Sequence, residues 1–145
     1  MKSKNDLFII YFLRLAISFA FLSAVADRFG LWGPAGSEGV VWGNFDNFTA
    51  YTALLSPFDL NSSIGFVLIS TMAIGATILE VVFGILLLTG VMLEKAALGS
   101  GILLLVFGLA MAFFLGIKPT QDYSVFSASA AAFALYTLSR KTTKQ

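Results

Sequence analysis

The sequence predicts an all-α fold, a bundle of four transmembrane helices in which residues 1–145 form a single integral membrane domain. The first observation is composition, because 58% of the residues are hydrophobic and only 12% are charged, whereas about 25% are charged in an average soluble domain. The mean hydropathy of +0.89 agrees with this. The second observation is that long apolar runs recur along the chain, and about 20 apolar residues in a helix cross about 30 Å of hydrocarbon.

Four apolar runs predict helices at about residues 7–28, 64–92, 96–117 and 122–139. The first run contains Arg14 and ends at Asp27 and Arg28. A basic N-terminus, an apolar run and the tripeptide A-V-A before Asp27 also resemble a secretory signal peptide. We favour a membrane span, because the run is longer than the apolar core of a signal peptide and contains a charge.

Residues 29–63 are predicted to form a long extracytoplasmic loop, rich in glycine and in aromatic side chains that favour membrane interfaces. Within this loop, residues 45–55 place apolar side chains at helical spacing, and Asn44 or Asp46 is suited to cap a helix there. We therefore expect a short helix on the membrane surface. It either folds over the bundle as a lid or belongs to an ordinary interfacial loop, and both alternatives remain open.

The third and fourth helices are expected to pack closely. Small residues recur every four positions in the third run, at Gly108, Ala112 and Gly116. In lipid, such residues let helix backbones approach one another. Pro119 is expected to end the third helix, since proline cannot continue one.

The distribution of lysine and arginine predicts the orientation. One flank of the spans holds Lys2, Lys4, Lys95, Arg140, Lys141 and Lys144. The other flank holds only Arg28 and Lys118. Because basic residues accumulate on the cytoplasmic side, both termini are predicted to lie in the cytoplasm.

Glu80 lies near the middle of the second run, where an unpaired carboxylate is costly. Arg14 is the other charge well inside an apolar run, so the sequence predicts a direct or water-bridged Arg14–Glu80 ion pair. Tyr11, Ser18 and Thr77 lie on the same helix faces and are predicted to complete this site. Two alternatives remain open, since Arg14 can extend to the lipid headgroups and Glu80 can be protonated. The pair itself suits either a structural or a ligand-binding role.

A second polar cluster is predicted at the outer membrane surface, where the first helix ends and the fourth begins. Its members are Asp27, Arg28, Trp42, Asp122 and Tyr123. Together with an apolar slot, such polar groups suit the carbonyl oxygens of a quinone.

The absence of cysteine and histidine excludes several kinds of chemistry. Thiol–disulfide exchange is impossible, and the usual ligands of haem, iron–sulfur clusters and zinc are missing. The sequence shows no metal site, no nucleophile–base pair and no phosphate-binding loop, so no catalytic residue is assigned. A net charge of +1 argues against nucleic acid as a partner. A redox role would therefore need an organic cofactor such as a quinone, or a partner protein.

Two stretches resemble the signatures of the DoxX family. Residues 14–28 read R-L-A-I-S-F-A-F-L-S-A-V-A-D-R, similar to its first-helix signature, and residues 80–90 read E-V-V-F-G-I-L-L-L-T-G, similar to its second. The segments F-G-L-W-G-P, V-W-G-N-F-D-N-F and D-Y-S-V-F resemble a subgroup of that family. The resemblance implies a four-helix bundle of bacterial inner membranes, linked in some relatives to quinone-dependent redox complexes. The thiol-based branch of the family does not carry over, because this chain has no cysteine.

The sequence thus predicts an accessory or quinone/lipophile-binding subunit of a membrane redox system, without catalytic activity of its own. The alternative is a non-enzymatic membrane scaffold, partner subunit or small-solute carrier. The expected partners are the lipid bilayer, a redox partner protein and further copies of the chain.

Overall fold

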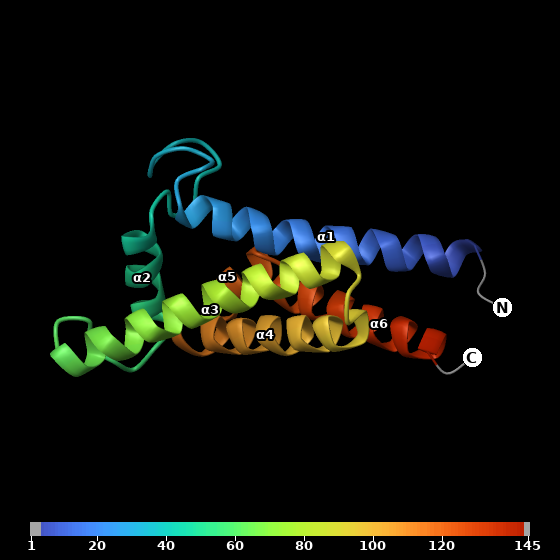
Figure 1. Ribbon diagram of the computed structural model, residues 1–145. Helices are drawn as coiled ribbons and strands as arrows, with labels where there is room; N and C mark the ends of the chain where they lie inside the picture. Colours follow the sequence, from blue (N-terminus) through green and yellow to red (C-terminus); the bar gives the residue numbers. More distant parts are fainter. Residues whose placement is uncertain (1–3, 144–145) are drawn as a thin grey trace.

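The computed structural model describes residues 4–143, and these form six helices and no strand. In chain order they are α1 (Lys4–Arg28), α2 (Phe45–Leu54), α3 (Ser63–Thr89), α4 (Leu93–Phe114), α5 (Ile117–Asp122) and α6 (Val125–Thr143). The four long helices run side by side, and α2 lies crosswise at one end of the bundle (Figure 1). The predicted all-helical fold is confirmed for these residues, whereas Lys2 and Lys144 of the charge count lie outside them.

Three of the described helices are long and apolar enough to cross a membrane, namely Asn5–Arg28 within α1, Ser63–Thr89 and Leu93–Phe114. This identifies three of the four predicted spans. In α6, serine, alanine and threonine occupy many positions that hold large apolar side chains in the other three helices. Among the described residues, α6 is not one of the candidate spans.

Glycine residues determine where α3 and α4 end. The hydroxyl of Ser62 caps α3 by accepting a hydrogen bond from the Gly65 N–H at 3.0 Å. The helix stops at Gly90, whose φ of 78° is in the left-handed region. Gly116, with φ of 92°, separates α4 from α5. The prediction that Pro119 ends the third helix is wrong, because Pro119 lies in the first turn of α5, where backbone N–H groups have no partner within the helix.

Small residues of α4 allow α6 to pack closely against it, as predicted. A Cβ atom at Gly101 would lie 2.8 Å from the ring of Phe133, and a Cβ atom at Gly108 would lie 2.8 Å from the ring of Phe126. The Ser129 hydroxyl also donates to the Gly101 carbonyl at 2.8 Å. Around these contacts, the core buries Ile10, Ile17, Phe21, Leu87, Ala96, Ala97, Ala132 and Leu135.

The predicted short helix in the long loop is confirmed as α2. Asn44 precedes it, and the Asn44 side chain accepts a hydrogen bond from the Asn47 N–H at 2.8 Å. Phe48 and Thr52, one turn apart, are its buried residues. Because α2 lies across the end of α1 and packs on α3 (Figure 1), the arrangement fits the lid alternative better than a loop separate from the bundle.

Candidate functional site

A cavity of about 480 Å³ lies beneath α2. Its walls come from the C-terminal half of α1, the loop that follows it, α2, the middle of α3 and the C-terminal half of α4. Apolar side chains such as Met72, Leu104 and Phe107 form most of the wall. Its polar members and its other aromatic members are Ser23, Asp27, Arg28, Trp32, Trp42, Phe48, Tyr51, Thr52, Glu80 and Tyr123.

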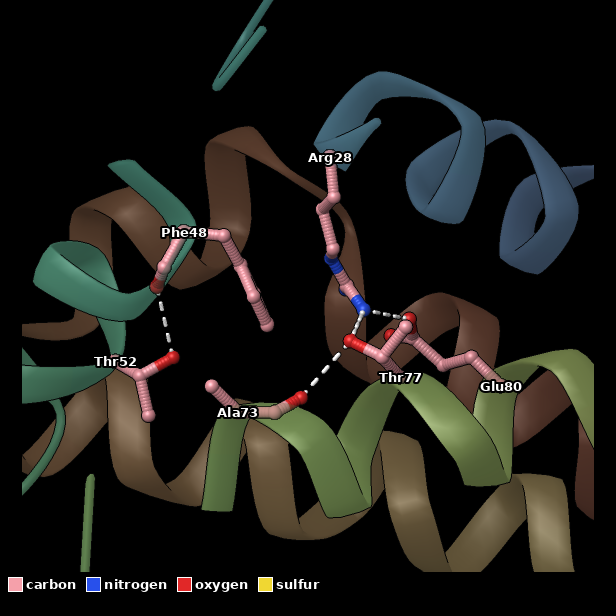
Figure 2. Close-up of polar contacts among 6 residues, drawn as sticks. All are labelled: Arg28, Phe48, Thr52, Ala73, Thr77 and Glu80. Atoms are coloured by element: carbon pink, nitrogen blue, oxygen red, sulfur yellow. Dashed lines mark hydrogen bonds and ion pairs between the residues drawn. The ribbon is translucent and has the colours of Figure 1, made fainter. Parts of the chain in front are cut away.

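An ion pair between Arg28 and Glu80 lies at one wall of the cavity (Figure 2). Nη1 of Arg28 lies 2.5 Å from Oε2 of Glu80, and the two side chains are only 2% and 4% exposed. The same nitrogen donates to the Thr77 hydroxyl at 2.8 Å. Thr77 in turn donates to the Ala73 carbonyl, one turn earlier in α3, at 2.8 Å. The pair therefore links the end of α1 to the middle of α3.

Aromatic rings cover the Arg28 guanidinium. Its Cζ atom lies 3.6 Å from the centre of the Phe48 ring and 5.1 Å from that of Trp42. A guanidinium is attracted to the face of an aromatic ring, most strongly where water is excluded. Arg28 is thus held by an ionic contact on α3 and by a ring from α2, which explains how so buried a cation is tolerated.

The predicted Arg14–Glu80 pair is not formed. Arg14 instead donates from Nε to the Leu87 carbonyl at 3.0 Å and from Nη2 to the Leu88 carbonyl at 3.3 Å. The Ser18 hydroxyl bonds the Gly84 carbonyl at 2.7 Å, so α1 and α3 run antiparallel with Arg14 about two turns beyond Glu80.

The physical reason for this change of partner is the end of α3. The last carbonyls of a helix have no N–H partner within it, and the end carries a partial negative charge. Arg14 satisfies two of these carbonyls and also lies over the Tyr11 ring, with Cζ 5.2 Å from the ring centre. Of the first predicted cluster, Tyr11, Ser18 and Arg14 therefore lie away from the cavity, and only Thr77 and Glu80 belong to the site.

Asp27 organises the loop that follows α1. Its Oδ2 atom accepts hydrogen bonds from the N–H groups of Val41 and Trp42, each at 3.0 Å. This holds the Trp42 indole against α2, with ring centres 5.1 Å from Phe48 and 6.1 Å from Tyr51. The structure thus brings together Asp27, Arg28 and Trp42 of the predicted outer cluster.

The two remaining members of that cluster separate. Tyr123 lines the cavity, but Asp122 is exposed and pairs with Lys118 at 2.5 Å on the surface of α5. The prediction that Asp122 joins the cluster is therefore wrong, because a lysine one helical turn away lies closer to it. Tyr51 joins the cavity instead, and burial raises the pKa of its hydroxyl above the usual value, with a smaller contribution from Tyr123. The Tyr51 hydroxyl therefore stays neutral at physiological pH.

Besides Oε2 of Glu80, which contacts Arg28 through the ion pair, three buried polar atoms of residues that line the cavity lack a hydrogen-bond partner among the described residues. They are Oδ1 of Asp27, Nε of Arg28 and Nε1 of Trp42. Each such atom costs about 1–3 kcal/mol when water is excluded. A bound molecule with matching polar groups would remove this cost, so these atoms define what the cavity can recognise.

The sequence analysis did not identify Phe48, Thr52 or Tyr51 as site residues. The one-turn spacing of Phe48 and Thr52 could have indicated them as site residues, because it places both side chains on one face of a short helix. Within the part of the chain that the structure describes, no group of three or more acidic side chains is placed to hold a metal ion.

No protein-family model matches the chain, and no curated protein or solved structure is significantly similar to it. The fold and the site together define a helical protein with three candidate membrane spans and a largely apolar cavity beneath a short crosswise helix.

Proposed function

We propose that this chain is a multi-pass membrane protein that binds a lipophilic small molecule in the cavity beneath α2. In this proposal it is an accessory subunit of a membrane redox system, with a quinone as the favoured class of ligand and no catalytic activity of its own. The cavity carries the proposal, because it combines an apolar wall with three unpartnered polar atoms.

The cavity has the size and character of a small-molecule site. Such sites measure roughly 300–1,000 Å³ and combine apolar walls with a few polar groups that fix orientation. The N–H groups of Trp42 and Arg28 that lack partners are donors, and a carbonyl oxygen is an acceptor. The Trp42 ring centre lies 5.1 Å from that of Phe48 and 6.1 Å from that of Tyr51, and this aromatic group supplies apolar contact for a quinone head.

A ligand that is soluble in lipid can reach this cavity from the bilayer. Met72 and Ala76 of α3, and Val106 and Ala110 of α4, line it. Met72 and Val106 are 44% and 55% exposed. The proposed route therefore passes between α3 and α4, whereas α2 covers the end of the bundle.

The proposal includes α6 as the fourth span and a bacterial inner membrane as the location. Its 19 residues would extend about 28 Å as a helix, which is close to the thickness of the hydrocarbon. It packs along α4 and returns the chain to the end at which α1 begins (Figure 1). The resemblance to the DoxX family supports the redox setting, while the absence of cysteine and histidine leaves electron transfer to the ligand or to a partner protein.

Extraction of bound lipophiles from the purified protein tests the proposal. Native mass spectrometry of the parent is expected to show a bound lipophile, and organic extraction followed by mass analysis would identify it. Ala76→Phe fills the cavity and is expected to abolish binding. Ile74→Phe places the same ring on the exposed side of α3, outside the cavity, and is expected to leave binding intact. The proposal would be contradicted if the parent protein carried no bound lipophile after purification and also failed to bind a lipophile that was added to it.

A further inference from the structure

Asp27 uses only one of its two carboxylate oxygens. Oδ2 accepts two backbone N–H bonds from the loop that follows α1, whereas Oδ1 is buried without a hydrogen-bond partner. The residue is 5% exposed and lines the cavity. An ionised carboxylate oxygen only accepts hydrogen bonds, so Oδ1 lacks a donor.

The donors nearby do not supply it. The Arg28 guanidinium is directed to Thr77 and Glu80 and stacks on Phe48. The indole N–H of Trp42 is itself without a partner, as is Nε of Arg28. Apart from Oε2 of Glu80, which is paired with Arg28, the residues that line the cavity therefore hold two buried donors and one buried acceptor without partners, and a ligand with acceptors alone leaves that acceptor unsatisfied.

We infer that the cavity recognises a phenolic hydroxyl on a lipophile, such as the reduced quinol form of a quinone. The inference rests on the proposed function, whose ligand class it narrows. A phenol donates one hydrogen bond and accepts others, so its O–H is donated to Oδ1 of Asp27 while its oxygen accepts from Trp42 or Arg28. A quinone carbonyl accepts from the same two donors and leaves Asp27 unsatisfied. The aromatic wall of Trp42, Phe48 and Tyr51 favours a ring beside the hydroxyl.

A matched pair of ligands tests this inference in the unmodified protein. In proteoliposomes of phosphatidylcholine, para-nonylphenol carries the hydroxyl, and its methyl ether has the same ring, chain and oxygen but no donor. Both tryptophans of the chain, Trp32 and Trp42, line the cavity, so their fluorescence reports occupancy. The phenol is expected to bind about tenfold tighter or more, because the ether leaves a buried charged acceptor unpaired.

One substitution assigns the preference to Asp27. In Asp27→Asn, the amide oxygen can keep the two loop hydrogen bonds while the amide NH₂ group replaces the acceptor by a donor. The ratio of the two affinities is expected to fall to about one or to reverse. Asp46→Asn removes the same charge at an exposed position on α2 outside the cavity, and is expected to keep the parent ratio.

The outcomes separate the two proposals. Equal affinity for phenol and ether in the parent would overturn the hydroxyl assignment and leave the lipophile cavity standing. An unchanged ratio in Asp27→Asn would overturn the assignment of Oδ1 of Asp27 as the acceptor of the hydroxyl. Dodecanol that binds as tightly as the phenol would overturn the assignment to an aromatic head. Absence of saturable binding by all three compounds would overturn the proposed function as well. If Asp27→Asn does not insert into the membrane, the comparison of phenol and ether in the parent protein still tests whether the cavity recognises the hydroxyl.

Discussion

Arg28 makes more structural contacts than any other charged residue of the site. It ends α1, contacts Glu80 and Thr77 on α3, and stacks against Phe48 on α2. A guanidinium stays charged at all physiological pH values, so its burial requires these partners. Arg28 therefore contributes both to the position of α2 over the cavity and to the position of α3 beside α1.

Removal of either member of the Arg28–Glu80 pair is expected to destabilise the fold. Breaking a buried ion pair costs about 3–5 kcal/mol because the other charge is stranded. Glu80→Met is expected to be worse than Arg28→Met, since a carboxyl group can take up a proton and a guanidinium cannot release one. The double variant is expected to lose less stability than the sum of the two single losses. The free energy of unfolding in mixed detergent micelles is measured for the parent, the two single variants and the double variant. If the double variant loses the sum of the two single losses, the residues do not interact.

Arg14→Met provides the control for this cycle. Arg14 is half-buried and bonds two carbonyls at the end of α3, so its loss is expected to cost only about 1–2 kcal/mol. Combined with Glu80→Met, the two losses are expected to add, because the side chains share no partner.

At the scale of single residues, sequence reasoning located the chemistry but chose the wrong partner for Glu80. Composition shows that Glu80 needs a cation, and two arginines of the first apolar run were available. The choice depended on the register between α1 and α3, which the contact of Ser18 with Gly84 reveals. It also depended on the unsatisfied carbonyls beside Gly90, which compete for Arg14. Neither is encoded in hydropathy or in the spacing of apolar residues.

At the scale of elements, α2 is short, and an isolated helix of 10 residues is only marginally stable in water. Its position depends on Asn44 at its start, on the ring of Phe48 against Arg28, and on the Trp42 loop held by Asp27. Sequence predicted this helix and named Asn44 as one of two candidate caps, because capping and helical spacing are local signals. Its packing over Arg28 was not predictable, since it is a contact between residues distant in the chain.

Loss of the cap of α2 is expected to loosen the cover of the cavity. Asn44→Ala removes the hydrogen bond to the Asn47 N–H and is expected to destabilise α2 by about 1 kcal/mol. Hydrogen–deuterium exchange is expected to rise across Phe45–Leu54 while α3 and α4 remain protected. Asn44→Asp retains an acceptor at the cap and is the matched control. Uniform exchange changes over all helices, or none over α2, would contradict this account.

At the scale of the whole molecule, composition and the lengths of the apolar runs were sufficient to predict a helical membrane protein. Three of the four predicted spans are long and apolar enough to cross a membrane, and α6 is not among the candidate spans of the described residues. Its serines and alanines suit contact with α4 rather than with lipid, since Ser129, Ala132 and Leu135 are buried in the bundle. A helix shielded by its neighbours needs fewer apolar side chains, which is why hydropathy alone identifies it less clearly than packing does.

The number of spans decides where the C-terminus lies, and this is open to direct test. If α6 crosses, both ends of the chain are cytoplasmic, in agreement with the lysine and arginine distribution. If only α1, α3 and α4 cross, the C-terminus lies outside. The chain has no cysteine, so a single introduced cysteine reports its own location without background labelling. Three such variants are used: Glu38→Cys, Lys95→Cys and a cysteine added after the last residue.

A membrane-impermeant maleimide applied to intact cells is expected to label Glu38→Cys, in the loop between α1 and α2. Lys95→Cys at the start of α4, and the C-terminal cysteine, are expected to react only after the membrane is permeabilised. Labelling of the C-terminal cysteine in intact cells while Lys95→Cys stays protected would show that α6 does not cross. Labelling of Lys95→Cys with protection of Glu38→Cys would instead reverse the orientation of the whole bundle, and would place the cavity beneath α2 on the cytoplasmic side.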